Sequence, residues 1–255
     1  MSKRKILKIT NACCLAEKYG ELFKLENSEL DRITTSTCTL NEIQKNGCEI
    51  STIYENYTSL NTDLGNYGYR MYSQFSFPTK EYVISVVGTY KEIKQMTRYK
   101  TGANLIEINL TCHNSSKQII AIGKLPFIHF KRKFGVKLPP YFDIEEIKRV
   151  SHLLNCLKKI SPWEFSYIVC CNVLSIEGKG ISGKVLKPIS LYNIRKFKKY
   201  LVKGIEIWGC GGIETIYDFK EYERAGASGV QLDSILLKEG LEYTNELIRN
   251  YRQQR

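Results

Sequence analysis

Short apolar runs, each of a length that suits a β-strand, recur along the whole chain and are rich in Ile, Val and Tyr. Between most of them lie segments in which apolar residues return every three or four positions, the period of an amphipathic helix. The strand-like runs cover residues 6–9, 33–35, 82–87, 103–110, 134–138, 166–172, 205–208 and 228–232. The helical segments cover residues 15–25, 91–99, 144–157, 191–201, 214–225 and 234–251. This alternation predicts parallel strands joined by right-handed helical crossovers.

Eight strand–helix units close most economically into a (β/α)8 TIM barrel, whose strands are buried on both faces and therefore form continuous apolar runs. The length of 255 residues suits one such barrel, and no linker rich in Pro, Gly or Ser divides the chain. We therefore expect residues 1–255 to form a single α/β domain; a doubly wound open sheet is the alternative. The connection 41–70 is long and polar, a candidate lid, and Pro126 disfavours a full crossover helix within 115–133.

The run 103–110 ends in the polar sequence Asn109-Leu-Thr-Cys-His-Asn114. Barrels and open α/β sheets hold their chemistry at such carboxyl ends, because the strand fixes position while the following loop gives access. This strand end carries one thiol, Cys112, and two carboxamides. Buried thiols are more often inert than reactive, but the position between two asparagines at a strand end favours a catalytic role for this one.

Glycine-rich segments follow two neighbouring strand-like runs. Gly209-Cys-Gly-Gly212 follows residues 205–208, and a second glycine-rich loop, 178–184, follows residues 166–172. Such glycines let backbone N–H groups approach a phosphate at a helix N-terminus, although a tight turn alone would also require them. Barrels commonly build a phosphate site from the loops after strands seven and eight, where Gly211-Gly212 and Asp233-Ser234 lie here. We therefore expect a phosphate-bearing cofactor.

Lys137 lies at the end of the run 134–138. A lysine that points into a barrel is rarely buried without a partner, so a role facing the cofactor is favoured over a place on the rim.

Charge and cysteine content limit the possible partners and the cellular compartment, but they do not identify a partner. The net charge of +12 would attract nucleic acid or another anionic partner. The basic runs 129–133 and 195–199 interleave aromatics with cations, as nucleic-acid surfaces do. An ordinary solvated helix face is favoured over that interpretation, because Ile194, Phe197 and Leu201 recur at helical spacing. The nine cysteines form no zinc-binding pattern with the three histidines. With no signal peptide and no apolar run near the roughly 20 residues of a membrane span, we expect a cytoplasmic protein without a membrane partner.

Four further motifs follow one another along the chain. They are Phe134-Gly-Val-Lys-Leu-Pro-Pro-Tyr-Phe-Asp143, Gly180-Ile-Ser-Gly-Lys-Val-Leu-Lys-Pro-Ile-Ser-Leu191, Gly209-Cys-Gly-Gly-Ile213 and Ala225-Gly-Ala-Ser-Gly-Val-Gln231. In this order they resemble successive signatures of the dihydroorotate dehydrogenases, and residues 109–114 are similar to the family's Asn-Leu-Ser-Cys-Pro-Asn loop. The cysteine in that loop points to class 1, and Leu-Pro-Pro-Tyr-Phe-Asp to its soluble 1A branch.

The resemblance implies an FMN-containing barrel that oxidises dihydroorotate to orotate in pyrimidine biosynthesis. It also implies a homodimer that reoxidises its flavin with fumarate. Cys112 would remove a proton from C5 of dihydroorotate while a hydride leaves C6 for the flavin. The substrate would be held by Asn61, Asn109, Asn114 and Asn172, and the FMN by Lys137, Gly183, Gly211 and Gly212.

Some cofactor positions differ from the family pattern. Ser36 stands where the family has a lysine that reaches both flavin and substrate, and a serine cannot replace that charge. Cys14 replaces a glycine beside the flavin, and Asp233-Ser234 replace Gly-Thr in the phosphate loop. The loops after Cys112 and Asn172 are trimmed. Two hypotheses follow: an FMN-dependent oxidoreductase, which the retained residues favour, or a catalytically impaired pseudoenzyme that serves as a binding or assembly module.

Overall fold

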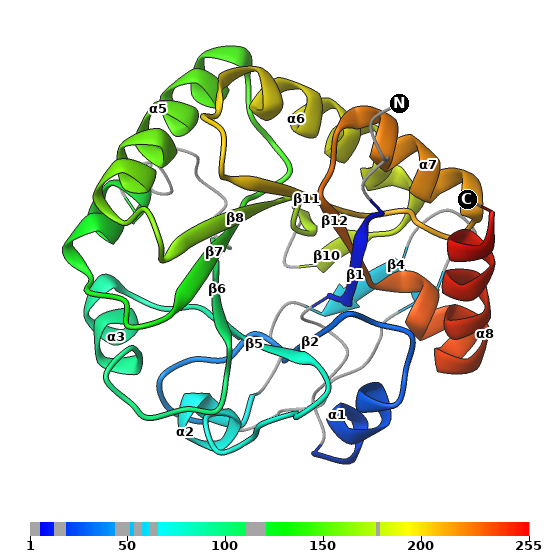
Figure 1. The fold of residues 1–255 in the computed structure, drawn as a ribbon, viewed down its shortest axis with the longest axis horizontal. Helices are drawn as coiled ribbons and strands as arrows, with labels where there is room; N and C mark the ends of the chain where they lie inside the picture. Colours follow the sequence, from blue (N-terminus) through cyan, green and yellow to red (C-terminus); the bar gives the residue numbers. More distant parts are fainter. Residues whose placement is uncertain are drawn as a thin grey trace.

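Eight parallel strands close into a barrel in the order β1, β12, β11, β8, β7, β6, β5, β2 (Figure 1). The computed structural model describes residues 6–12, 19–43, 52–53, 58–61, 66–110, 121–176 and 179–254, with backbone alone for 19–21, 52–53, 58–61 and 179. The barrel strands are β1 (Lys8–Asn11), β2 (Arg32–Thr34), β5 (Glu81–Val86), β6 (Leu105–Asn109), β7 (Lys133–Lys137), β8 (Phe165–Cys170), β11 (Glu206–Cys210) and β12 (Gly229–Leu232). Each falls on one of the apolar runs, so the predicted TIM barrel is confirmed and the open-sheet alternative is wrong.

Helices surround the barrel on its outer side (Figure 1). Capping boxes fix the first turns of three of them, at Thr89, Asp143 and Thr215. The helices in the described part of the chain are α1 (Tyr19–Glu26), α2 (Gly68–Tyr72), α3 (Tyr90–Met96), α5 (Ile144–Ile160), α6 (Lys187–Tyr200), α7 (Ile216–Ala225) and α8 (Ser234–Gln253). All but α2 overlap predicted helical segments. No described helix is long and apolar enough to span a bilayer.

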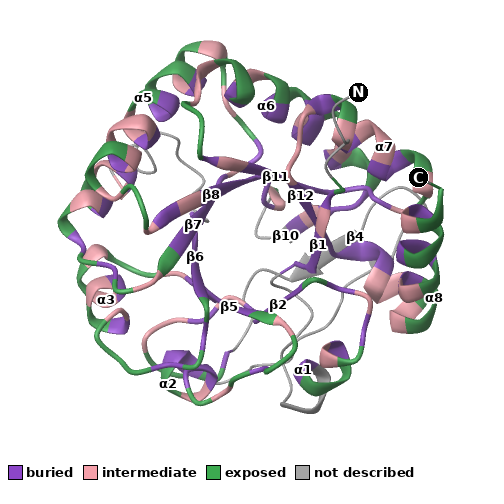
Figure 2. Cartoon of the chain, in the orientation of Figure 1, coloured by how far each residue is buried: buried purple, intermediate pink, exposed green. Residues whose placement is uncertain are grey.

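Two apolar clusters form the core of the described part of the chain. The larger lies between strands and helices, with Ile84 and Ile168 on the strands and Val150 and Leu154 on α5. Buried residues accordingly concentrate on the strands and on the inner sides of the helices (Figure 2). The smaller cluster consists of alternate strand residues, which point into the barrel. Its members are Ala12, Val83, Leu105, Tyr167, Val169, Trp208 and Cys210.

Two glycines make room for aromatic rings inside the barrel. A Cβ on Gly135 would lie 2.3 Å from the ring of Tyr167, and one on Gly229 would lie 2.7 Å from the ring of Trp208. The guanidinium of Arg32 lies 4.3 Å from the centre of the Trp208 ring. Side chains therefore fill this part of the barrel, which is a packed core rather than a channel. The carboxyl ends of the strands are left as the place for a site.

A second, antiparallel sheet lies outside the barrel and corrects one prediction. Its strands, in spatial order, are β3 (Thr52–Ile53), β4 (Thr58–Asn61), β10 (Lys179–Ser182) and β9 (Leu174–Ile176). The prediction of a glycine-rich loop over residues 178–184 is therefore wrong for Lys179–Ser182, which pairs with β4 and β9. Among the described glycines of this segment, Gly183 alone, at φ 98°, keeps the conformation expected of a turn glycine.

The connection that contains Pro126 has little helix in its described part. Residues 121–124 are helical and lead into the 3-10 turn η1 (Leu125–Phe127), which holds the proline. A second 3-10 turn, η2 (Lys184–Leu186), links Gly183 to α6.

Candidate functional site

Four polar side chains form one hydrogen-bonded chain at the carboxyl ends of the barrel strands. The Nδ2 of Asn172 donates to Oδ1 of Asn109 at 2.6 Å, and the Nδ2 of Asn109 donates to Oγ1 of Thr37 at 2.9 Å. The hydroxyls of Thr37 and Ser85 are 3.0 Å apart. The Oδ1 of Asn172 also accepts from the N–H of Val173 at 2.9 Å. Both carboxamides are buried and oriented, so they offer a fixed pattern to a planar ring that carries N–H and C=O groups.

The sequence predicted Asn109 and Asn172 but not Thr37 and Ser85. A signal for Ser85 was present, because a serine inside the apolar run 82–87 has to face the barrel interior if its neighbours face the helices. Thr37 lies shortly after the end of β2, and Asn109 is the last residue of β6, so a position near a strand end was the available signal for Thr37.

Other predicted residues cannot be placed in this way. Cys112, Asn114 and Cys14 lie outside the described residues. The backbone of Asn61 ends β4 and pairs with Lys179 of β10, but its side chain lies outside the description. The roles assigned to these residues therefore stay predictions.

Two serines near the strand ends have buried hydroxyls without a partner. Neither the Oγ of Ser36 nor the Oγ of Ser182 has a hydrogen-bond partner among the described residues. Ser36 directly precedes Thr37, and Ser182 directly precedes Gly183. A buried hydroxyl that lacks a partner costs free energy, so each marks a place where a polar ligand atom would be stabilising.

The glycine loops after β10 and β11 pack against each other. Gly211 and Gly212 have φ angles of 114° and 63°, which side-chain-bearing residues rarely adopt. A Cβ on Gly212 would lie 2.8 Å from Cα of Lys184 and 3.2 Å from the carbonyl oxygen of Gly183. The predicted glycines Gly183, Gly211 and Gly212 thus form one backbone surface, of the kind that accepts phosphate oxygens.

The two helices that follow this surface begin differently. At α7, Oδ2 of Asp218 accepts from the N–H groups of Glu214 and Thr215, at 2.9 and 2.7 Å, so the chain itself occupies this N-terminus. At α8, Asp233 and Ser234 are both buried, and the helix begins without a side-chain cap. The start of α8 is therefore the better place for an anion.

Ion pairs tie these segments together. Glu214 is 3.1 Å from Nζ of Lys184 and 3.3 Å from Nζ of Lys238 in α8. Lys187 bonds Asp218 and Glu221 at 2.6 and 2.7 Å. Partial burial alone would lower the pKa of Lys187, but these two bonds raise it above its ordinary value. The positive charges of these lysines therefore offset the carboxylates of Glu214, Asp218 and Glu221 beside the glycine loops.

Lys137 is buried, as the sequence predicted. It is 2% exposed at the end of β7, where its backbone pairs in register with Asn109. Its Nζ donates to Oε1 of Gln231 at 2.9 Å. Gln231 belongs to a motif noted in the sequence, but no site role was predicted for it.

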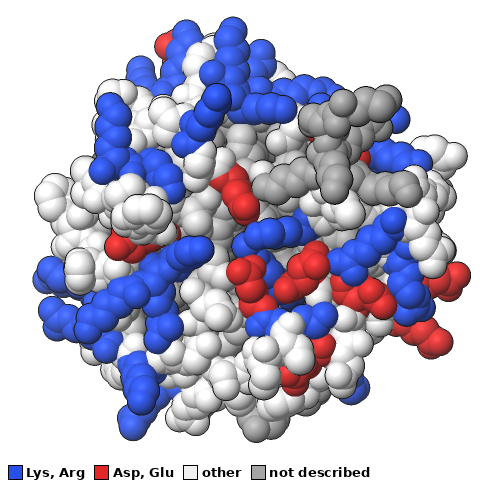
Figure 3. Space-filling model, viewed as in Figure 1, with Lys and Arg blue, Asp and Glu red and all other residues white. Residues whose placement is uncertain are grey.

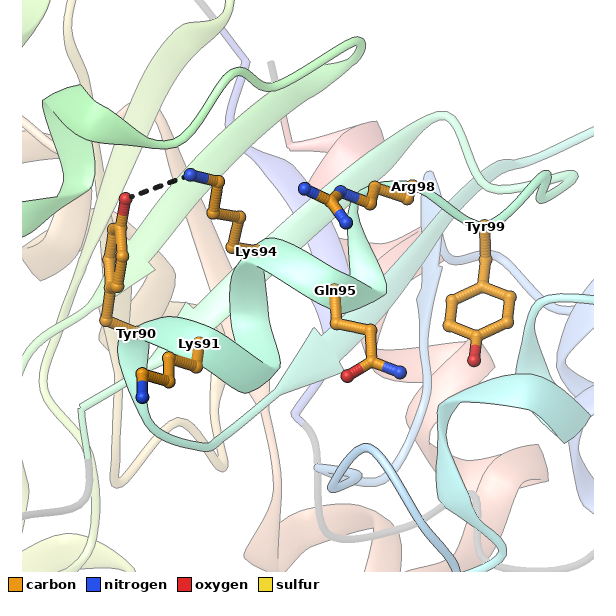
Figure 4. Close-up of a pocket in the computed structure, with 6 residues that line it drawn as sticks. All are labelled: Tyr90, Lys91, Lys94, Gln95, Arg98 and Tyr99. Atoms are coloured by element: carbon orange, nitrogen blue, oxygen red, sulfur yellow. Dashed lines mark hydrogen bonds between the residues drawn. The ribbon is translucent and has the colours of Figure 1, made fainter.

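A surface hollow of about 630 Å³ lies on the outer helix α3, away from the barrel mouth (Figure 4). Basic side chains are widespread on the surface, and acidic ones gather nearer the middle and right of the face in Figure 3. The residues that line the hollow recur at the helical spacing of an ordinary solvated face. Its lining residues are Tyr90, Lys91, Lys94, Gln95, Arg98 and Tyr99.

In the described part of the chain, no group of three or more His, Cys, Asp or Glu residues could hold a metal ion.

Comparisons with known proteins agree with this geometry. Residues 55–254 match the family model of dihydroorotate dehydrogenase. A relative from Streptococcus agalactiae serotype Ia, provisionally named dihydroorotate dehydrogenase A (fumarate), is 30% identical over 268 residues, which span 91% of this chain and 84% of the relative. A relative of the same provisional name from Streptococcus pyogenes serotype M18 is 29% identical over 255 residues, which span 86% of this chain and 80% of the relative.

Proposed function

Because the chain belongs to the dihydroorotate dehydrogenase family, a family of flavin-dependent oxidoreductases, we propose that it oxidises dihydroorotate to orotate with FMN as its cofactor. The observation that carries the proposal is the hydrogen-bonded chain through Asn109 and Asn172 at the strand ends, beside the buried Lys137. As part of the same proposal, the protein works in pyrimidine biosynthesis in the cytoplasm as a homodimer. Fumarate is the proposed electron acceptor, as in the names of the streptococcal relatives.

The residues present fit FMN. The positive φ angles of Gly183, Gly211 and Gly212 would let backbone N–H groups approach the phosphate, which Ser234 at the start of α8 would also help to hold. Lys137 would lie near the flavin ring, and the unpartnered hydroxyl of Ser36 would find a polar partner there. When bound, FMN would supply the acceptor for a hydride.

The protein's own residues would then orient dihydroorotate and move one proton. Asn109 and Asn172, together with Asn61 and Asn114, would bind its carboxylate and amide groups. Cys112 as a thiolate would take the proton from C5 while the hydride leaves C6, so that a C5–C6 double bond forms. A thiol with an ordinary pKa of about 8.5 can serve as this base near neutral pH if its surroundings favour the thiolate.

Two substitutions favour a second candidate function, a barrel that binds or assembles without catalysis. Ser36 cannot supply the positive charge of the family's lysine. The carboxylate of Asp233 lies at the start of α8, where it would repel a phosphate unless it points away. A pseudoenzyme of this kind would use its +12 charge to engage an anionic partner.

The visible spectrum of the purified protein distinguishes the two functions. We expect a flavin spectrum, directly or after FMN is supplied, which bleaches when dihydroorotate is added without oxygen and returns when fumarate follows. A protein that takes up no FMN contradicts the flavin-dependent function. Bound FMN that dihydroorotate fails to bleach favours the pseudoenzyme.

Cys112→Ser tests the assignment of the base. A hydroxyl is a far weaker base than a thiolate near neutral pH, so flavin reduction should slow by about a hundredfold or more while FMN stays bound. Rapid mixing with dihydroorotate measures this rate. Equal rates in the two proteins would show that Cys112 is not the base.

A further inference from the structure

A second polar chain crosses the barrel interior. The Nζ of Lys137 on β7 donates to Oε1 of Gln231 on β12 at 2.9 Å. The Nε2 of Gln231 in turn donates to Oε2 of Glu107 on β6 at 2.7 Å. Because β12 is not adjacent to β6 or β7 in the barrel, the bonds span the interior. All three side chains are at most 2% exposed.

The direction of these bonds matches the charges at the two ends. An amide accepts at its oxygen and donates at its nitrogen, so Gln231 lies with its dipole aligned between an ammonium group and a carboxylate. A buried lysine without a counter-charge tends to lose its proton, because burial disfavours the charged form. Glu107 supplies such a counter-charge through one intervening amide, which makes a protonated Lys137 compatible with its burial.

Neighbouring titratable groups support Glu107 as the source of that counter-charge. Tyr167 donates to the same Oε2 at 3.2 Å; burial, and then the charge of Glu107, raise its pKa well above the ordinary value, so it remains a neutral donor. Near Lys137, burial is also the main cause of the raised pKa of Cys171, so that residue remains a neutral thiol. Arg32, the cation deeper in the barrel, donates a hydrogen bond to the carboxylate of Glu81 and is therefore paired with a different acid.

We propose that Glu107 and Gln231 are positioning residues that keep Lys137 protonated and hold its ammonium group at the mouth of the barrel. We call the hydrogen-bonded series Lys137–Gln231–Glu107 the relay. It is a property of the protein without cofactor. Its consequence rests on the proposed function, because the group that Lys137 would face is then the FMN ring. A cation fixed there stabilises the negative charge that arrives with two electrons, and so it raises the reduction potential of the bound flavin.

The first test needs no flavin. In apoprotein labelled with ¹⁵N-lysine, NMR at neutral pH should show a charged ammonium for Lys137, assigned by its absence in Lys137→Met. Glu107→Gln should convert that signal to a neutral amine, and Gln231→Leu, which breaks the relay but keeps Glu107, should do the same. The matched control is Tyr167→Phe, which removes another hydrogen bond to Glu107 and should leave Lys137 charged. A neutral Lys137 in the wild-type protein, or a charged one in a folded Glu107→Gln protein, overturns the proposal.

A second readout uses the FMN-loaded protein. The flavin midpoint potential should fall in Glu107→Gln and stay at the wild-type value in Tyr167→Phe, a difference that a merely structural role would not produce. If no FMN binds, the proposed function fails while the NMR experiment still decides the relay. If FMN binds and dihydroorotate reduces it, but the potentials of wild type and Glu107→Gln coincide, the relay fails and the proposed function stands.

Discussion

The two sides of the barrel mouth are built from different parts of the chain. The amide side, formed by Thr37, Ser85, Asn109 and Asn172, consists of side chains that bond one another. The glycine side, formed by Gly183, Gly211 and Gly212 with Asp233 and Ser234 at the start of α8, is mainly a backbone surface with positive φ angles. One side depends on which residue types are present, and the other on which backbone angles are possible.

This difference explains how the departures from the family pattern should be weighed. On the amide side, replacing one residue removes a specific donor or acceptor and leaves its partner unsatisfied. On the glycine side, a new side chain leaves the N–H groups in place as long as the backbone angles survive. Asp233 should therefore weaken phosphate binding through its charge rather than abolish it. Ser36, by contrast, removes the positively charged side chain that the family uses to reach both flavin and substrate.

The largest effect should follow from Asn172→Ala on the amide side. This change removes the donor to Asn109 and the acceptor of the Val173 N–H, so kcat/KM for dihydroorotate should fall by about a hundredfold. FMN should remain bound, as its absorption spectrum would report. The matched control is Asn155→Ala in α5, which also removes two hydrogen bonds, here to the backbone of Tyr200 and Val202. If both variants lose activity equally, the amide side has no special role in binding.

Gly212→Ala should have the next largest effect, on the glycine side. The added Cβ meets the backbone of Lys184 at 2.8 Å, and φ is 63°, so unfolding free energy should drop by about 1–3 kcal/mol. FMN should bind about tenfold more weakly, because the loop can no longer hold its conformation. Urea denaturation and flavin titration measure the two quantities. Gly123→Ala is the control: nothing lies within 4 Å of its Cβ, so it should neither lower the free energy of unfolding nor weaken FMN binding.

Asp233→Asn should have the smallest effect. Removing one negative charge near the phosphate should tighten FMN binding by about two- to fivefold, and the gain should shrink as salt is raised. Flavin titrations at low and high ionic strength test this, with Asp143→Asn, at the N-cap of α5, as a charge-matched control. Weaker binding by the Asp233 variant would mean that the carboxylate supports the loop instead of opposing the ligand.

Much of the barrel could be predicted because its strands are buried on both faces. The runs 82–87 and 103–110 are predominantly apolar, and β5 and β6 overlap them. The second sheet could not be predicted in this way. The sequence of β4, Thr58-Ser-Leu-Asn61, is short and polar, and it becomes a strand by pairing with β10 about 120 residues later. A glycine-rich sequence such as that of β10 reads locally as a loop.

Residues of the site differ in the same way in how well the sequence predicts their positions. Asn109 and Asn172 stand near strand ends, and parallel strand ends converge, so their proximity could be predicted. Glu107 and Gln231 stand within strands, where a continuous apolar run does not show which positions face the interior. A carboxylate inside the run 103–110 was nevertheless a signal, since a buried charge needs a partner across the barrel.

The most direct test of the proposed function is an anaerobic titration of the FMN-loaded protein with dihydroorotate, followed by visible absorption and by assay of orotate. We predict that the flavin absorbance is lost as orotate forms in an amount equal to the flavin reduced. An unchanged spectrum with FMN fully bound and excess dihydroorotate present would contradict it.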